Sequence, residues 1–314
     1  MERKNLRALI TGITGFAGGH LKEFLRKKYI DVFGIADPKF PSDKKGIYVL
    51  DIRKFKSLKA IIKDLKPDLV FHFAAISNVS KSWLNKRLTF QTNFFGTLNL
   101  LEAIKHTSPD SKILLVGSAE MYGNVPQVKQ PINEKFPINP VNPYATSKAA
   151  QELLGKLYLN GEGLNVYFVR SFNYTGPGQS ENFVCSDLAR QIIFIEKGLS
   201  PPVIKTGNLE IKRDFSDVRD VIKAYYLILT KGKRGEIYQT CSGKTYRIRE
   251  ILEILLSYTD KKIRIIEDTK KKRKHDIPVL HGDFNKLRKD TGWKPEIPIE
   301  KTLLDLINWW RVIV

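Results

Sequence analysis

Three side chains in the middle of the sequence have the types and the spacing that proton transfer needs. Tyr144 and Lys148, in the segment NPYATSKAAQ, are four residues apart and would share one face of a helix. A tyrosine, with an ordinary pKa of about 10, exchanges protons poorly at neutral pH, and a neighbouring ammonium lowers that pKa because it favours the phenolate. Ser118 ends the apolar run KILLVGS, where it would position a substrate oxygen. Together the three residues predict an acid–base centre.

A carboxylate, Glu120, lies two residues beyond Ser118 in the segment GSAEMYG. At the end of a buried strand such a group has the chemistry of a general base that removes a proton. A site that needs no such base could also carry the residue unused. The sequence leaves both interpretations open.

A glycine-rich loop near the start of the chain predicts a dinucleotide site. The segment ALITGITGFAGGHL places Gly12, Gly15 and Gly18, with Phe16 among them, between a predicted strand and a predicted helix. Glycine there allows a tight turn and close backbone approach to a pyrophosphate, which then faces the helix N-terminus. An ordinary glycine-rich turn is the alternative. A Tyr–Lys pair alone is common on exposed helices, and this loop strengthens its interpretation as part of an enzyme.

The end of the second predicted strand, GIADP, bears on the choice of nicotinamide cofactor. Asp37 lies where a carboxylate would accept the adenosine ribose hydroxyls and repel a 2′-phosphate, which favours NAD(H). Lys39 is close enough to keep NADP(H) open, and Asp37 could instead cap the turn before Pro38. We expect Lys148 and Tyr144 to contact the cofactor as well. Four further strand-end residues are expected cofactor contacts, namely Asp51, Ile52, Ala74 and Ala75.

The elements that must position these residues alternate along the chain. Apolar runs at 7–11, 31–36, 47–52, 69–75, 112–118 and 165–171 are predicted strands, separated by amphipathic helical segments. This pattern predicts an α/β fold with a Rossmann-type doubly wound parallel sheet. We assign residues 1–170 to this domain, with 217–240 returning to it. Residues 171–216 and 241–314, where Gly and Pro are frequent, form a smaller mixed α/β lobe that closes over a ligand.

Composition excludes several classes of protein. Neither cysteine, Cys185 or Cys241, lies in metal-ligand spacing, so no metal site is expected, and two cysteines in 314 residues are typical of a cytoplasmic protein. No apolar run approaches the roughly 20 residues that span a bilayer, and the N-terminus lacks a secretory pattern. The net charge of +20 favours anionic partners. Because lysines are scattered and not interleaved with aromatic residues, nucleic acid is not an expected partner.

Longer motifs resemble a known family. TGITGFAG, HFAAISNV, TNFFGT, GSAEMYG, PYATSK and RSFNYTGPGQ resemble the extended short-chain dehydrogenase/reductases that remodel nucleotide sugars, over essentially the whole chain. SFNYTGPGQSENFV, GNLEIKRDFSDVRD, IYQTCSG and PVLHGDFNKLRKDTGWKPEIP most resemble GDP-4-keto-6-deoxy-D-mannose reductases, with GDP-mannose 4,6-dehydratases as near relatives. These motifs separate the two activities poorly.

The resemblance implies a GDP-sugar substrate and residues that bind it. Arg213 and Arg273 match positions that clamp the nucleotide diphosphate, although Arg273 lies in the basic run KKKRKH, which could simply be solvated. Asp276 stands where relatives carry a glutamate for the nucleotide ribose. The remaining implied substrate contacts are Ser77, Asn173, Asn208 and Leu209. Relatives commonly dimerise through a four-helix bundle, for which the apolar faces of 85–105 and 145–159 are suited; those faces could also cover the sheet.

Three reactions are compatible with this resemblance. In the reductase, which we favour, NAD(P)H reduces the C4 ketone and Tyr144 supplies the proton, giving GDP-D-rhamnose. In the dehydratase, Glu120 removes the C5 proton of an oxidised sugar and water leaves from C6. In a 4-epimerase a carboxylate contributes nothing, and a nucleotide-sugar binding protein would need no catalytic residues. Two departures from relatives stand out: reductases carry an arginine-like 2′-phosphate contact near Asp37, and dehydratases show Thr-Ser-Glu at 118–120.

Overall fold

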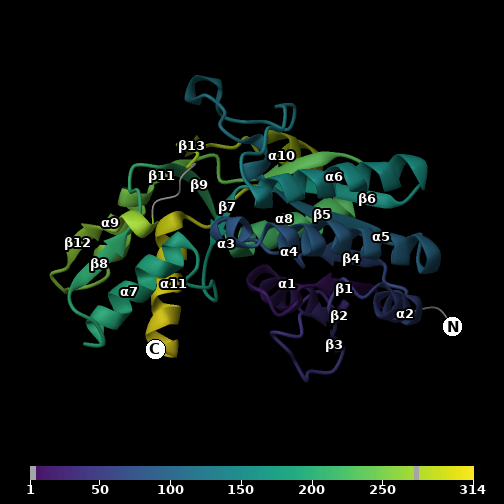
Figure 1. Cartoon of the computed structure of the whole chain (residues 1–314), viewed down its shortest axis with the longest axis horizontal. Coiled ribbons are helices and arrows are strands. Elements are labelled where there is room, and N and C mark those ends of the chain that lie inside the picture. The colour runs from purple at the N-terminus through teal and green to yellow at the C-terminus, as the bar shows by residue number, and fades with distance from the viewer. Residues whose placement is uncertain (1–4, 272–275) are drawn as a thin grey trace.

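The fold combines a large parallel sheet with a smaller lobe. A computed structural model of the protein describes residues 5–271 and 276–314. In Figure 1 the large sheet with its helices lies on the right, beside the N-terminus, and the smaller lobe lies on the left with the C-terminus. The sheet has seven strands in the order β10-β6-β5-β4-β1-β2-β3, and every neighbouring pair is parallel. The predicted Rossmann-type doubly wound sheet is confirmed.

The strands of this sheet form because their residues are apolar on both faces, as a sheet covered on two sides requires. Two of them are shorter than predicted: β3 ends at Val49 and β4 at His72, so 50–52 and 73–75 leave the sheet as loops at its carboxyl edge. The strands are β1 (Arg7–Thr11), β2 (Asp31–Ala36), β3 (Ile47–Val49), β4 (Leu69–His72), β5 (Lys112–Ser118), β6 (Asn165–Ser171) and β10 (Ile237–Thr240).

Helices cover the two faces of the sheet with separate apolar cores. On one face Leu21 of α1 and Tyr225 of α8 pack against Ile10. On the other face Leu58 of α2, Leu100 of α5 and Tyr158 of α6 belong to a second cluster. The helices of this part are α1 (Phe16–Arg26), α2 (Phe55–Leu65), α3 (Val79–Leu84), α4 (Lys86–Phe90), the π-helix η1 (Gln91–Phe95), α5 (Gly96–Thr107), η2 (Ala119–Tyr122), η3 (Gln127–Lys129), α6 (Pro143–Gly161) and α8 (Val218–Lys231).

The smaller lobe is built from the two chain segments that leave the sheet after β6 and after β10. Its helices α7, α9 and α11 share a core that includes Ile192, Leu252 and Leu306. One sheet joins β11, β9, β13 and β7, and a second pairs β12 with β8. The elements are β7 (Asn173–Thr175), α7 (Val184–Glu196), β8 (Val203–Thr206), β9 (Lys212–Asp217), β11 (Thr245–Arg247), α9 (Ile248–Leu256), β12 (Arg264–Glu267), η4 (Thr269–Lys271), β13 (Val279–Leu280) and α11 (Ile299–Ile313). Helix α10 (Asn285–Thr291) instead packs against α8 and β10 of the large sheet.

A buried histidine joins three elements beneath the carboxyl edge of the sheet. His72 Nδ1 lies 2.7 Å from Thr11 Oγ1 and its Nε2 lies 2.8 Å from Thr97 Oγ1. Since the Thr97 hydroxyl donates to a helix carbonyl, it accepts from Nε2, and Nδ1 is left to accept from Thr11. Burial lowers the pKa of His72 to about 3, so the ring is neutral. Thr11 then accepts from Ala74 N and holds the loop after β4.

A buried ion pair ties α6 to the sheet. Arg170 of β6 donates from Nε and Nη2 to the two carboxylate oxygens of Glu152, both at 2.8 Å. Its Nη1 donates to the hydroxyl of Tyr122 at 2.9 Å, and Gln239 of β10 donates to the same hydroxyl. Paired bonds of this kind are directional. The network therefore fixes α6 and η2 relative to β6.

Residues 5–271 and 276–314 contain neither a helix that could span a membrane nor a cluster of metal-binding side chains. No helix there is long and apolar enough to cross a membrane. No group of three or more His, Cys, Asp or Glu side chains is arranged there to hold a metal ion.

Candidate active site

The glycine loop connects β1 to α1 at the centre of the carboxyl edge. Gly12 has φ +74°, and a Cβ on Gly12 would approach Ala74 N to 3.0 Å. A Cβ on Gly18 would lie 2.3 Å from Gly12 O, closer than any side chain allows. Helix α1 begins at Phe16 after Gly15, so no side chain shields its first N–H groups. This cradle fits a pyrophosphate.

The loop after β2 presents charges of both signs. Asp37 is exposed, and its carboxylate accepts from Lys39 N at 2.8 Å, which is the turn-capping role considered as an alternative. Asp51 forms an ion pair with Arg53 at 2.6 Å, and the hydrogen bond from Arg53 lowers the pKa of Asp51. The pKa of Arg53 is raised by Asp51 and, to a smaller degree, by the charge of Asp37. An arginine and a lysine thus lie near Asp37. Ile52 beside them is buried.

Ser118 and Tyr144 are brought together, as predicted. Ser118 is the last residue of β5, and Tyr144 lies in the first turn of α6, where Asn142 caps the helix by accepting from Ala145 N at 2.8 Å. Burial raises the pKa of Tyr144 above its ordinary value, and its hydrogen bond to Ser118 lowers it. The pair therefore presents a protonated phenol and a hydroxyl to the same point.

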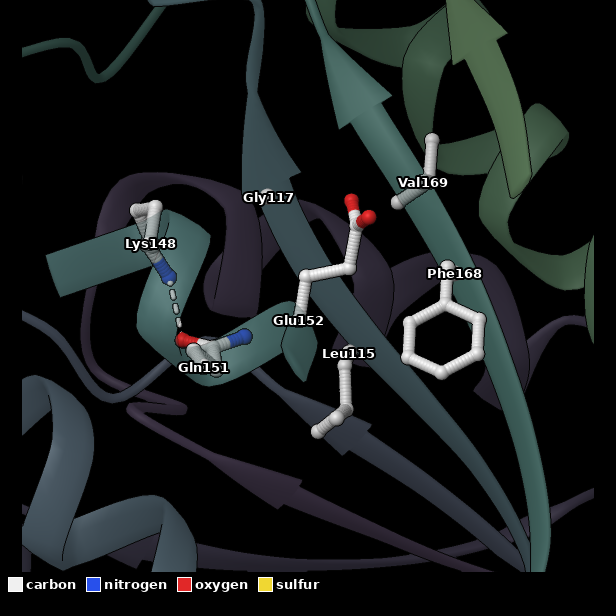
Figure 2. Close-up of a pocket in the computed structure, with 7 residues that line it drawn as sticks. All are labelled: Leu115, Gly117, Lys148, Gln151, Glu152, Phe168 and Val169. Carbon is white, nitrogen blue, oxygen red and sulfur yellow. Dashed lines mark hydrogen bonds between the residues drawn. The ribbon is translucent and has the colours of Figure 1, made fainter. Parts of the chain in front are cut away.

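Lys148 lies one turn further along α6 and is 4% exposed. Its ammonium donates to Val116 O at 2.7 Å and to Gln151 Oε1 at 3.0 Å; Figure 2 shows the second bond. Among the described residues, Tyr144 is not a hydrogen-bond partner of Lys148. Burial lowers the pKa of Lys148 to about 7, so the ammonium loses its proton far more easily than an exposed lysine.

Glu120 lies inside the site but is held by a neighbour. It is half-buried in η2, and its Oε2 accepts from Asn142 Nδ2 at 3.0 Å. Its charge contributes, after burial, to the raised pKa of Tyr144, which places the carboxylate close to the phenol. The amide that caps α6 thereby also fixes the carboxylate.

The expected substrate contacts lie on the smaller lobe and on the loop after β4. Asn173 of β7 pairs with Phe215 of β9, the strand that carries the buried Arg213. Asn208 and Leu209 are half-buried between β8 and β9, where Asn208 accepts from Glu210 N at 2.9 Å. Of the other expected substrate contacts, Ser77 is exposed, Asp276 is half-buried and Arg273 lies outside the described residues. The expected cofactor contacts Ala74 and Ala75 are half-buried.

Sequence reasoning missed a group of phenols beside Tyr144. Tyr174 of β7 stacks on Phe16 with ring centroids 5.9 Å apart, which joins the lobe to the glycine loop. Tyr174 also hydrogen-bonds Tyr225 of α8, whose hydroxyl lies 2.7 Å from Ser171 Oγ. No sequence signal identifies this group, because its members come from three distant segments.

Asn142 and Gln151 were also missed, although one of them carried a signal. An Asn directly before a Pro at the start of a helical pattern is an N-cap signature. The second hydrogen bond of Asn142, to Glu120, depends on the position of η2 in the fold. Gln151 follows Lys148 by three residues, a spacing that allows contact on a helix, but its type gives no indication of catalysis.

Comparison with known proteins agrees with this arrangement. Residues 9–306 match the family described as GDP-mannose 4,6 dehydratase. The chain belongs to this family. It is 34% identical to the GDP-6-deoxy-D-mannose reductase of Pseudomonas aeruginosa over 97% of both chains. It is 31% identical to GDP-mannose 4,6 dehydratase 2 of Arabidopsis thaliana, over 96% of this chain and 86% of that one.

Solved structures of this superfamily share the fold. RMD of Pseudomonas aeruginosa, complexed with NADPH, superposes with a TM-score of 0.88 at 34% identity, covering 99% of this chain and 100% of that one. The UDP-glucose 4-epimerase of Thermus thermophilus, complexed with NAD, gives 0.87 at 26% identity, covering 98% and 100%. These two structural neighbours thus bind different nicotinamide cofactors.

The buried charge of Lys148 predicts a pH-dependent effect on stability. Because its pKa falls from 10.5 to about 7 on folding, the unfolded chain binds more protons between these pH values. The free energy of unfolding of the wild type should therefore gain, relative to Lys148→Met, up to about 1.4 kcal/mol per pH unit from pH 7 toward pH 10. Urea unfolding of both proteins at pH 7 and 9.5 measures this; a constant difference between them would contradict it.

Proposed function

We propose that this protein is an enzyme, an NAD(P)H-dependent reductase that converts GDP-4-keto-6-deoxy-D-mannose to GDP-D-rhamnose. The observation that carries the proposal is the 34% identity to a GDP-6-deoxy-D-mannose reductase across 97% of both chains. The hydrogen-bonded Ser118 and Tyr144 beside a glycine loop supply the chemistry that such a reduction needs.

The reaction requires a hydride on C4 and a proton on the ketone oxygen. A bound nicotinamide cofactor supplies the hydride. Ser118 hydrogen-bonds the ketone oxygen, and Tyr144 donates its proton to it as negative charge develops. Lys148 lies within the same turn of helix and, as an ammonium, stabilises the phenolate that remains. Its other role is to bind the cofactor ribose.

The cofactor lies across the carboxyl edge in this proposal. Gly12, Gly15, Phe16 and Gly18 bind the pyrophosphate, while Asp51 and Ile52 border the adenine and Ala74 and Ala75 the nicotinamide ribose. Asp37 favours NADH through the adenosine ribose. Lys39 and Arg53 nearby have the opposite tendency, since they would attract a 2′-phosphate.

The smaller lobe binds the nucleotide sugar. Arg213, buried on β9, pairs with the diphosphate, and Asn173 contacts the sugar. Asn208 and Leu209 border the base, and Asp276 and Ser77 complete the set, with Arg273 as a second cation. We propose the domain division on the same basis: residues 1–170 with 217–240 bind the cofactor, and 171–216 with 241–314 bind the substrate.

GDP-mannose 4,6-dehydration is the second candidate, and Glu120 is the observation that favours it. The carboxylate lies beside Tyr144, where a base for the C5 proton is needed. The reduction needs only one proton, which Tyr144 supplies, and the Glu120 carboxylate instead accepts a hydrogen bond from Asn142. We therefore assign Glu120 no proton transfer in the reduction.

Turnover by purified protein separates the two reactions. We expect NAD(P)H to be consumed only when GDP-4-keto-6-deoxy-D-mannose is present. Tyr144→Phe should lower kcat by about 10²–10⁴-fold, because the proton donor is lost. Glu120→Gln, which keeps an acceptor for Asn142, should retain most of the activity. Cofactor oxidation and product analysis measure all three proteins.

Conversion of GDP-mannose without added reductant, abolished by Glu120→Gln, would instead establish the dehydratase. Full activity in Tyr144→Phe would remove the catalytic scheme altogether.

The cofactor preference is tested at Asp37. Asp37→Ala should raise the ratio of kcat/KM for NADPH over NADH about fivefold, because two like charges about 4 Å apart in water repel by about 1 kcal/mol. Asp43→Ala, which changes another exposed carboxylate after β2, is the matched control. An unchanged ratio in Asp37→Ala would exclude Asp37 as the selective residue.

We also propose a homodimer formed by a four-helix bundle of α5 and α6 from two copies. Leu153 and Leu157, one turn apart on α6, are 58% and 62% exposed, and Phe95 before α5 is 52% exposed. Apolar side chains aligned in this way favour burial against a second copy. Sedimentation should show a dimer that Leu153→Glu with Leu157→Glu converts to a monomer. Leu199→Glu, at an exposed leucine of the smaller lobe, should leave the dimer intact.

A further inference from the structure

Gln151 forms a closed set of hydrogen bonds with the ammonium of Lys148. Its Oε1 accepts from Lys148 Nζ at 3.0 Å, and its Nε2 donates to Val116 O at 3.3 Å. Lys148 Nζ donates to the same carbonyl at 2.7 Å. Gln151 is 1% exposed, so its amide is dedicated to these partners. Two of the three ammonium protons are thereby occupied.

Within residues 5–271 and 276–314, no carboxylate neutralises this buried ammonium through a hydrogen bond. Glu152, the acid next to Gln151, is bonded on both oxygens by Arg170, and Lys156 donates to it as well. The amide oxygen of Gln151 and the carbonyl of Val116 are therefore the negative ends of dipoles that stabilise the charge. Burial of a charged group without such partners is unfavourable.

The amide of Gln151 lies in a confined part of the structure. Figure 2 shows Lys148, Gln151 and Glu152 of α6 beside a narrow space against β5 and β6, which is also lined by side chains such as Phe168 and Leu115. If the Gln151 oxygen were removed, one ammonium proton would lose its acceptor inside the protein.

Other titratable and charged groups also face this ammonium, and they differ by element. His72 of β4 is neutral and has its pKa lowered by burial and then by the Lys148 charge. Tyr144 and Glu152 share α6 with Lys148, and Arg170 of β6 is bonded to Glu152. In the described part of the chain, none of these groups forms a hydrogen bond with Lys148.

We propose that Gln151 is a positioning residue that keeps the Lys148 ammonium charged and aimed, leaving its third proton for the catalytic site. The inference rests on the proposed function, in which Lys148 stabilises the phenolate of Tyr144 and binds the cofactor ribose. A free lysine side chain has about 2 kcal/mol of rotamer entropy. Gln151 removes part of this freedom before substrate binds.

The charge state of Lys148 provides a test that needs no turnover. In ¹⁵N-lysine NMR of the full-length protein, the Lys148 Nζ titration midpoint should fall by about one pH unit in Gln151→Met, a tenfold loss of proton affinity. In Gln151→Glu it should rise by at least as much, because a carboxylate pairs with the ammonium. Gln239→Met, which changes another buried glutamine that bonds Tyr122 instead, should leave the midpoint unchanged.

A residue that merely fills space would not move the midpoint in opposite directions. Equal midpoints in wild type, Gln151→Met and Gln151→Glu would overturn the inference, even if the protein proves to be the proposed reductase. Should Gln151→Met fail to fold, Gln151→Glu carries the test alone. Absence of reductase turnover would refute the proposed function but would leave this titration interpretable.

The pH profile of kcat links the charge to the reaction. Since the charged ammonium is the active form, activity should fall as pH rises through the Lys148 pKa. The alkaline limb should move to lower pH in Gln151→Met and to higher pH in Gln151→Glu, with little change in KM for the sugar. Identical alkaline limbs in all three proteins would contradict the role of Gln151 in the reaction.

Discussion

A buried ion pair between Arg170 and Glu152 sets the geometry on which the site depends. Its two bonds of 2.8 Å hold α6 against β6, and a third bond from Arg170 to Tyr122 holds η2. Removing one member would leave a buried charge without a partner, at a cost of about 3–5 kcal/mol. Ser118 ends β5, the neighbour of β6 in the sheet, and Tyr144 and Lys148 lie on α6, the helix that carries Glu152. The ion pair holds α6, which carries Tyr144, against the sheet that carries Ser118, and so supports the hydrogen bond between these two residues.

Between Lys148 and Glu152 the face of α6 turned toward the sheet is polar, whereas Leu154 and Tyr158 further along the helix belong to the apolar core. Lys148, Gln151 and Glu152 all project from it, and each finds partners on β5 or β6. Burial makes the ammonium easy to deprotonate and makes the phenol of Tyr144 hard to deprotonate. In water the two groups have similar proton affinities, and these opposite shifts move them apart. The phenol therefore keeps its proton in the fold while the ammonium can lose its own.

The same cap that starts α6 also restrains the carboxylate that could change the reaction. Asn142 accepts a backbone N–H with one end of its amide and donates to Glu120 with the other. Asn142 thereby connects the start of α6 to η2 and fixes the position of the Glu120 carboxylate.

The sequence alone determined the fold class and identified the residues of the candidate site, among them the glycine loop and the Tyr144–Lys148 pair. The glycine loop, the alternating apolar runs and the Tyr–Lys spacing depend only on local geometry: tight turns, helix periodicity and strands buried on both faces. The sequence also indicated that Asp37 favours NADH, but in the folded loop that carboxylate caps a turn beside Lys39 and near Arg53. Only the tertiary structure decided which groups touch: Tyr144 with Ser118, Glu120 with Asn142, and Lys148 with Gln151 and Val116. These contacts join elements far apart in the chain, and their energies depend on burial. Neither property can be read from a pattern of neighbouring residues, because desolvation and hydrogen bonding act only once the elements have packed.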